Sequence, residues 1–205
     1  MLLKVASWKI VVIVMLLLVS QALLALGSRR PKTPPPGETL PPDSFCHQLA
    51  SFAQNPVGQI IEDQPVDQIV VDKGRRLLYL FQGDQAIRSY KIAMGASPQG
   101  HKRQQGDERT PEGNYLIEYK NPNSKYHLSL AVDYPNAADE AYAEEHGVSP
   151  GGDIMIHGLP NPWWQRMFVN HPEKNWTNGC IAVNDQEIEE IWELVEAGTR
   201  IEICR

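Results

Sequence analysis

The chain has 205 residues, of which 42% are apolar and 21% charged, and its formal net charge is −6. This length is sufficient for one domain with a hydrophobic core and a flanking segment. Residues 1–32 hold five of the 19 basic side chains and no acid, so residues 33–205 carry 14 basic against 25 acidic residues, about −11. A domain this acidic lacks the basic surface that polyanions require, so nucleic-acid binding is excluded.

The first feature along the chain is an uncharged apolar run, residues 10–28, preceded by Lys4 and Lys9. As a helix rising about 1.5 Å per residue, it would nearly span a hydrocarbon core of roughly 30 Å. Two interpretations of residues 1–28 remain open: a signal peptide cleaved after the small residues 25–27, or an uncleaved anchor in the inner membrane. Both predict export to the periplasm or cell envelope of a bacterium.

Residues 29–66 are predicted to form a proline-rich linker and a lead-in to the domain. The stretch PKTPPPGETLPPD, residues 31–43, has a proline density that excludes a helix or a central strand and favours an extended spacer. A short helix is expected near residues 45–54, FCHQLASFAQ.

The chain contains three cysteines, Cys46, Cys180 and Cys204. In an oxidising compartment, Cys46 and Cys204 are candidates for a disulfide that ties the ends of the domain together. That pairing, a hypothesis at this point, would leave Cys180 as a free thiol.

The domain itself is predicted over residues 67–205 and begins with strands. Residues 68–95 contain three apolar runs separated by hairpin connections at 72–74 and 82–84. Helices are expected over residues 136–147 and from Asn184 or Asp185 to a stop at Gly198. Further strands are expected at residues 114–119, 126–134, 153–157 and 199–203. The combination predicts a β-rich α+β domain with about two helices.

Two residues are candidates for chemistry: His157, at a predicted strand end before Gly158, and Cys180, directly after Gly179. A thiolate is a strong nucleophile, but a free cysteine has a pKa of about 8.5 and needs a basic partner near neutral pH. Backbone N–H groups of residues 178–180 are placed to stabilise an oxyanion. Taken alone, the pair does not decide between catalysis and the commoner role of cysteine as a small buried residue.

The segments IMIHG (154–158) and TNGCIAVND (177–185) resemble the signature H-x(14–17)-[S/T]-H-G-C-h-N of the L,D-transpeptidase catalytic domain, the YkuD-type fold. The strands in 68–95 and the segment GDERTPEGNY (106–115) are similar to the opening hairpins and TPxG turn of that family. The resemblance covers about residues 67–204 and implies a mixed β-sheet or sandwich fold.

The chain departs from the family pattern in three places. Asn178 stands where the family has a second histidine, and Ala182 stands where asparagine or arginine is usual. Nineteen residues, 158–176, separate His157 from Thr177, slightly more than the usual spacing. The candidate nucleophile and base are both retained. These departures therefore concern how the substrate is bound and which acceptor is used.

The resemblance implies that Cys180 attacks a peptide carbonyl and that His157 takes its proton. Gly158 would orient the imidazole, and the oxyanion turn would be shaped by Thr177, Asn178 and Gly179. The implied donor is a peptidoglycan tetrapeptide stem, which forms a thioester at the L-centre of diaminopimelate and releases D-alanine. A second stem as acceptor gives a 3→3 crosslink, a lipoprotein lysine gives a wall-anchored protein, and water gives cleavage. No cofactor or metal is required.

Three neighbouring residues between the catalytic pair have open roles. Trp163 and Trp164 are either core anchors or a lid that contacts substrate, and Arg166 either meets a stem carboxylate or lies on the surface. A zinc site is not expected, because no histidines or cysteines lie at the short spacing typical of zinc ligands. A hydrolase acting on the same stems, and a non-catalytic wall-binding relative, remain as alternative functions.

Overall fold

The computed structural model describes residues 44–52, 57–62 and 64–205, apart from the side chain of Ser51. The apolar run 10–28 and most of the proline-rich linker lie outside these residues, together with the predictions of export and anchoring made from them. Within the described part of the chain, no helix combines the length and the apolar character needed to cross a bilayer.

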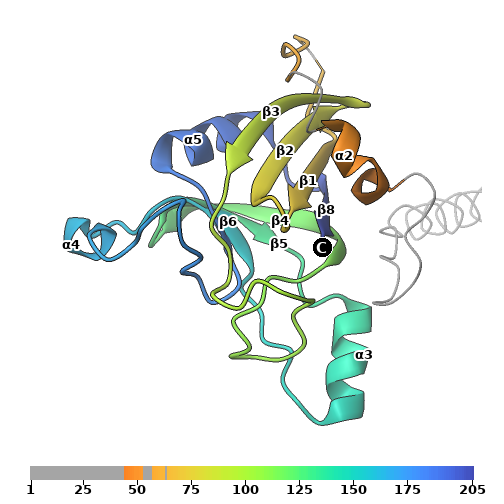
Figure 1. Ribbon diagram of the computed structural model, residues 1–205, viewed down its shortest axis with the longest axis vertical. Helices are drawn as coiled ribbons and strands as arrows, with labels where there is room; N and C mark the ends of the chain where they lie inside the picture. The colour runs from red at the N-terminus through yellow and green to blue at the C-terminus, as the bar shows by residue number, and fades with distance from the viewer. Residues whose placement is uncertain (1–43, 53–56, 63) are drawn as a thin grey trace, which may run out of the picture. The chain divides into compact units, whose positions relative to one another are not determined.

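The domain is built on a mixed sheet of eight strands in the order β3-β2-β1-β8-β4-β5-β6-β7, and Figure 1 shows its strands as arrows. The β1–β8 and β6–β7 pairs are parallel, and the other neighbours are antiparallel. The predicted β-rich α+β class is therefore confirmed. The strands are Gln68–Asp72 (β1), Leu77–Gln82 (β2), Gln85–Lys91 (β3), Gly113–Ser124 (β4), His127–Val132 (β5), Met155–His157 (β6), Ile181–Ala182 (β7) and Arg200–Cys204 (β8).

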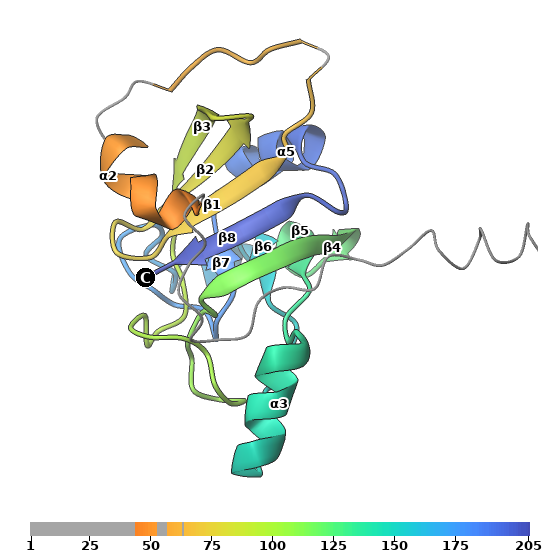
Figure 2. The ribbon, with the colours of Figure 1, turned by 90° about the vertical axis from the view of Figure 1, so that its right-hand side faces the viewer.

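Strands β1 and β2 are buried on both faces, which explains why their apolar residues are consecutive instead of alternating. One face joins the main core through Ile69, Val71, Leu78 and Leu80. The other face presents Val70, Tyr79 and Phe81 to a smaller cluster. This second cluster is covered by the 3-10 turn η1 (Phe45–Gln48) and helix α2 (Leu49–Phe52), which are seen beside β1 in Figure 2.

A disulfide between Cys46 and Cys204 joins η1 to β8, with the two Cα atoms 5.5 Å apart and a sequence separation of 158. This is the pairing raised as a hypothesis from the sequence. The neighbouring carboxylate of Glu202 accepts hydrogen bonds from the backbone N–H of Phe45, at 2.9 Å, and from the hydroxyl of Ser44. The lead-in segment is thus held against the last strand by covalent and polar contacts together.

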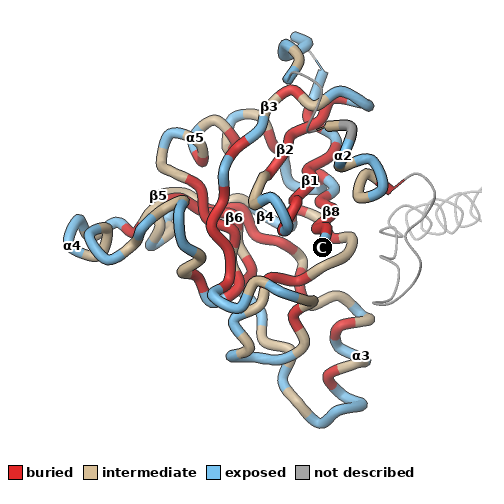
Figure 3. The backbone as a smooth tube through the Cα atoms, in the orientation of Figure 1, coloured by how far each residue is buried: buried red, intermediate tan, exposed pale blue. Residues whose placement is uncertain are grey.

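Two helices of ten residues, α3 (Ala137–His146) and α5 (Asp185–Leu194), begin at asparagine N-caps, each with a reciprocal capping box. Helix α5 buries Ile188 and Ile191 in the main core. A further single turn, α4 (Trp163–Arg166), projects from the domain, and Figure 3 shows exposed and intermediate residues along it.

The predicted stop of the last helix at Gly198 is wrong. Helix α5 ends at Leu194, and Val195 is already extended, with φ −109° and ψ 132°. The side chain of Val195 is fully buried in the main core. A β-branched residue accepts an extended backbone readily, so core packing ends the helix before the glycine is reached.

Candidate active site

His157 is the last residue of β6, and its ring orientation is set by its own neighbour. The Nδ1 atom lies 2.7 Å from the carbonyl oxygen of Gly158. Because a carbonyl only accepts, Nδ1 must carry the hydrogen, which leaves Nε2 as the atom that can take up a proton. Gly158 is buried, and a Cβ added there would lie 2.8 Å from Oδ1 of Asp185. A larger residue would therefore disturb the backbone that orients the imidazole.

Two aromatic side chains enclose the imidazole of His157. The ring of Tyr126 lies 4.4 Å from it, with a tilt of 32°, and the ring of Trp176 meets it edge-on at 5.7 Å. His157 is 3% exposed. Burial lowers the pKa of His157 to about 4, and the nearby His171 acts in the same direction against the Gly158 hydrogen bond. The imidazole is therefore neutral at neutral pH.

Cys180 directly precedes β7, beside the start of β6. Its thiol donates a hydrogen bond to the carbonyl oxygen of Asp153 at 3.3 Å. Burial raises the pKa of Cys180, and the charge of Asp153 adds to this, while the Met155 backbone N–H and Lys102 act in the opposite direction. The resting side chain of Cys180 is thus a thiol and not a thiolate.

The strand register relates the two candidate residues. In the parallel β6–β7 pair, His157 is opposite Ala182 and Ile156 is opposite Ile181. Cys180 directly precedes Ile181, so it lies at the entry to β7, next to the strand that ends at His157. The thiol and the imidazole are thus carried by neighbouring segments of the sheet, and among the described residues no hydrogen bond joins them.

The turn that carries Cys180 is attached to the segment after β3 by backbone hydrogen bonds. Thr177 donates its N–H to Met94 at 3.1 Å and accepts from the N–H of Ala96 at 3.0 Å. Asn175 accepts from the N–H of Met94 at 3.0 Å through its side chain. These bonds hold the segment that leads to Cys180 against residues 94–96.

Thr177 also closes the turn on itself. Its hydroxyl donates to the carbonyl oxygen of Cys180 at 2.6 Å and accepts from the N–H of Gly179 at 3.2 Å. The Gly179 N–H is consequently engaged, which corrects the expectation that all three N–H groups of residues 178–180 face an oxyanion. Among the described residues, no partner is found for the N–H groups of Asn178 and Cys180, so these two are the remaining candidates.

Gly179 meets a geometric demand that other residues cannot. Its φ is +130°, and a Cβ added there would lie 2.6 Å from the carbonyl oxygen of Arg109. Because of this close approach, the loop that leads into the TPEG segment, residues 110–113, lies directly against the turn that carries Cys180. Thr110 of that segment is fully buried and accepts a hydrogen bond from the N–H of Gly95 through its hydroxyl at 3.2 Å.

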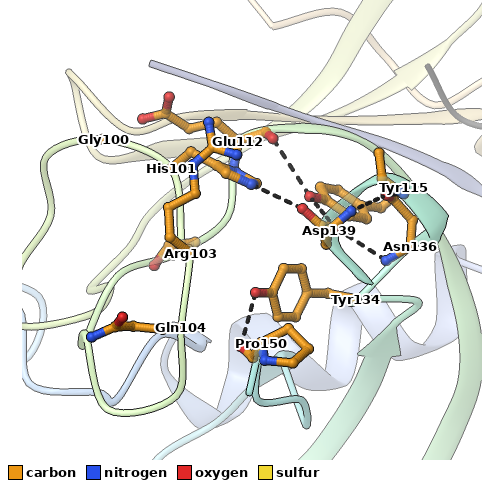
Figure 4. Close-up of polar contacts among 12 residues, drawn as sticks. Gly100, His101, Arg103, Gln104, Glu112, Tyr115, Tyr134, Asn136, Asp139 and Pro150 are labelled. Carbon is orange, nitrogen blue, oxygen red and sulfur yellow. Dashed lines mark hydrogen bonds and ion pairs between the residues drawn. The ribbon is translucent and has the colours of Figure 1, made fainter. Parts of the chain in front are cut away.

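A network of hydrogen bonds among largely buried side chains holds this loop against the rest of the domain (Figure 4). The N–H of Glu112 donates to Nδ1 of His101 at 2.9 Å, so the Nε2–H of His101 must donate to Asp139, also at 2.9 Å. The second carboxylate oxygen of Asp139 accepts from the hydroxyl of Tyr115 at 3.0 Å and from the N-cap residue Asn136 at 3.1 Å. Burial, with the carboxylate of Asp139, raises the pKa of Tyr115 well above its usual range. The network connects the loop to β4 and α3.

Trp163 and Trp164, which lie between His157 and Cys180 in the sequence, are not packed in the core. Trp163 is 72% exposed and Trp164 is 51% exposed, so the interpretation as core anchors is wrong. Arg166 donates to the carbonyl of Pro160 at 2.6 Å and forms an ion pair with Asp185 at 2.8 Å. Its guanidinium is thus held by the carbonyl of Pro160 and by the first residue of α5. Asn178 is exposed at the turn.

The residues around the imidazole and the thiol were not found from the sequence. Tyr126 lies in the β4–β5 turn, 31 positions before His157, and nothing in its local sequence distinguishes it from a strand residue. Trp176 directly precedes Thr177 of the motif, a position that could have drawn attention to it. Asp153 could not have been recognised, because its contact with the thiol is made by a backbone carbonyl.

A cavity of about 630 Å³ lies on the side of Asn175 and is not lined by Cys180 or His157. Its lining includes three basic residues and one acid, Lys73, Arg76, Arg205 and Glu112. Lys73 is fully engaged by Glu112 at 2.9 Å and by the carbonyls of Gly100 and Thr110.

Comparison with known proteins identifies the family. The profile of the YkuD family, the L,D-transpeptidase catalytic domain, matches residues 67–203. The chain is 31% identical over 166 residues to "Putative L,D-transpeptidase YafK" from Escherichia coli strain K12, which covers 76% of this chain and 59% of that protein. The chain therefore spans less than two thirds of the length of this relative.

Solved structures show the same fold. The helical cell shape determining protein Pgp2 from Campylobacter jejuni has a TM-score of 0.53 at 24% identity, covering 78% of this chain and 55% of Pgp2. Its K307A mutant has a TM-score of 0.54 at 23% identity, covering 75% of this chain and 52% of the mutant. Since the family profile extends over most of the described domain, this chain belongs to the family of L,D-transpeptidase (YkuD) catalytic domains.

Proposed function

We propose that this protein is an exported L,D-transpeptidase that acts on peptidoglycan stem peptides through a thioester on Cys180, with His157 as the base. The observation that carries the proposal is the hydrogen bond from Nδ1 of His157 to Gly158, which leaves Nε2 able to accept a proton. The strand pairing supports it, because β6, which ends at His157, lies beside β7, which Cys180 directly precedes.

Because the thiol of Cys180 and the imidazole of His157 are both neutral at rest, the proposed reaction begins with transfer of the thiol proton. As Sγ of Cys180 bonds to the carbonyl carbon at the L-centre of diaminopimelate, the thiol proton passes to Nε2 of His157. The backbone N–H of Cys180, with that of Asn178, would stabilise the oxyanion. When the peptide bond breaks, the same proton goes to the departing amine of D-alanine. An acceptor amine then gives a proton to His157, attacks the thioester and displaces the thiolate, which takes the proton back.

The acceptor is the open part of the proposal. A second stem peptide would give a 3→3 crosslink, and the lysine of a lipoprotein would give a wall-anchored protein. Hydrolysis of the same thioester by water is the second candidate. It stays a candidate because Asn178, exposed where the family has a histidine, changes the turn that precedes Cys180, where an acceptor would approach the thioester.

The cellular setting is also proposed. The uncharged run 10–28 supports placement in the periplasm, either as a cleaved signal peptide or as an anchor in the inner membrane. Pgp2, which shares the fold, is described as determining helical cell shape. Remodelling of the wall that changes cell shape is therefore a role to examine for this protein.

The test is mass analysis of the protein after incubation with tetrapeptide muropeptides from a diaminopimelate-containing wall. We expect a thioester on Cys180 together with loss of D-alanine, and no adduct on Cys180→Ala. A 3→3 dimer would establish transpeptidation, and tripeptides without dimers would establish the hydrolase. Absence of a thioester and of any product, also with a carbapenem as acyl donor, would overturn the proposed enzyme and leave a wall-binding relative.

A further inference from the structure

The most exposed large apolar side chains of the described residues lie together on one projection. Trp163, Trp164, Met167 and Phe168 are 72%, 51%, 66% and 81% exposed. No other large apolar residue of the described chain exceeds 46%. These four residues, with Gln165 and Arg166 between them, form what we call the α4 tip, residues 163–168. The N–H of Phe168 donates to Gln165 at 3.0 Å and that of Val169 to Arg166 at 3.3 Å, so these side chains are carried by one short hydrogen-bonded segment.

The base of the α4 tip is firmly held, so the exposed side chains are presented on a fixed support. Asp185 accepts the backbone N–H of Leu159 at 2.9 Å with one carboxylate oxygen and pairs with Arg166 at 2.8 Å with the other. Asn161 accepts from the N–H of His127 at 2.7 Å and donates to the carbonyl of Ser124 at 2.9 Å. The tip is thus tied to α5 and to the β4–β5 turn.

A contiguous exposed apolar surface of this kind marks a site of interaction. The α4 tip is a projection and not a groove, so it suits a surface that can be penetrated. Its composition of two tryptophans, a phenylalanine and a methionine is typical of side chains that enter the interface between lipid headgroups and acyl chains.

The charges near the α4 tip point to the same partner. Residues 154–172 contain Arg166 and two histidines and no Asp or Glu, in a domain where residues 33–205 carry about −11. The tip has no acidic side chain of its own and its one cation, Arg166, is paired with Asp185 of α5, so it avoids the repulsion from anionic headgroups that the acidic remainder of the domain would experience. A membrane is also within reach of the chain, because 15 residues, 29–43, separate the apolar run 10–28 from the first described residue, Ser44. Fully extended, they span at most about 50 Å.

We propose that the α4 tip is a membrane-docking element that inserts its four apolar side chains into the interface of a phospholipid bilayer. The proposal does not depend on the reaction catalysed. It replaces substrate contact as the role of Trp163 and Trp164. Because the α4 tip lies in the segment that joins His157 to Cys180, docking would set the orientation of the candidate active site relative to the membrane.

The test uses residues 33–205, because the apolar run 10–28 would itself bind lipid. Both hydrophobic clusters and the disulfide lie within these residues, so the segment has a complete core. The protein is sedimented with vesicles of phosphatidylethanolamine and phosphatidylglycerol, and tryptophan emission is recorded in parallel. We expect binding with a blue shift of the emission and quenching by brominated lipid. The variant Trp163→Ser/Trp164→Ser/Phe168→Ser should bind at least about tenfold less, since each side chain contributes by the apolar area it buries.

The matched control is Ile61→Ser/Tyr119→Ser, which removes exposed apolar side chains, 46% and 45% exposed, elsewhere on the domain. It should bind vesicles as the wild type does, and both variants should keep the wild-type circular dichroism because the substituted side chains are exposed. Failure of the wild-type domain to bind vesicles, or equal binding by the triple variant, would overturn the proposal. Dimerisation lost in the triple variant, without vesicle binding, would assign the tip to a second copy. Retention on purified cell-wall sacculi with the same pattern would assign it to glycan.

Discussion

The Nδ1 atom of His157 is hydrogen-bonded to the carbonyl oxygen of Gly158, the next residue in the chain, at 2.7 Å. This contact assigns the tautomer of the imidazole without a separate orienting carboxylate. It also ties the imidazole to the backbone at the end of β6, so that its position depends on the sheet itself.

The buried imidazole predicts that stability falls in mild acid. The pKa of His157 is about 4 in the folded protein and about 6.5 when the chain is unfolded, so between these values only the unfolded state binds the proton. The free energy of unfolding should therefore decrease as the pH falls from 6.5 to 4, by about 3 kcal/mol from this residue. Urea unfolding at pH 7, 5 and 4 measures the change. The variant His157→Gln should lose this part of the pH dependence, and an unchanged slope would contradict the assignment.

The raised pKa of Cys180 predicts a slow thiol in the resting protein. Because only the thiolate reacts, alkylation by iodoacetamide should accelerate about tenfold per pH unit from pH 7 upward. His157→Gln should leave this rate nearly unchanged, since the thiol is bonded to Asp153 and not to the imidazole. A plateau already reached at pH 7 would show a preformed thiolate–imidazolium pair and contradict the neutral resting state.

The ring of Tyr126 is expected to exclude water from the imidazole of His157. Removal of its ring in Tyr126→Ala should admit water, weaken the effect of burial and move the pKa of His157 from about 4 toward its usual 6.5. Titration of the imidazole resonances by NMR measures this change. Tyr126→Phe retains the ring and should leave the pKa unchanged, whereas equal pKa values in Tyr126→Ala and the wild type would exclude the role.

Gly179 is expected to tolerate no side chain. In Gly179→Ala the new Cβ would meet the Arg109 carbonyl at 2.6 Å with φ at +130°, which should destabilise the protein by at least about 2 kcal/mol. Gly152→Ala is the matched control, because nothing lies within 4 Å of a Cβ at that exposed position. Thermal unfolding of the two variants provides the comparison, and similar melting temperatures would count against the geometry of the turn.

The disulfide predicts a strong effect of reductant on stability. Cys46 and Cys204 close a loop with a sequence separation of 158, and in the chain-entropy description such a crosslink contributes about 5 kcal/mol. Treatment with dithiothreitol should lower the unfolding midpoint in urea. Mass analysis after denaturation and alkylation should find one labelled cysteine without reduction, Cys180, and three with it. Three labelled cysteines without reduction would exclude the disulfide in the purified protein.

Local patterns in the sequence were sufficient for much of the fold. The hairpins of β1, β2 and β3 follow from short apolar runs separated by turn residues, and the starts of α3 and α5 follow from their asparagine N-caps. Such features depend on residues a few positions apart. The end of α5 could not be predicted in this way, because Val195 turns extended to enter a core built from distant strands.

The same distinction applies to the candidate site. The sequence by itself determined the order of His157, Thr177, Gly179 and Cys180, because their spacing forms a motif. Only the tertiary structure decided that Tyr126 and Trp176 enclose the imidazole, that Thr177 engages the N–H of Gly179, and that Trp163 and Trp164 point outward. Burial and hydrogen bonding are set by the segments that pack around a residue, and those segments are distant in the sequence.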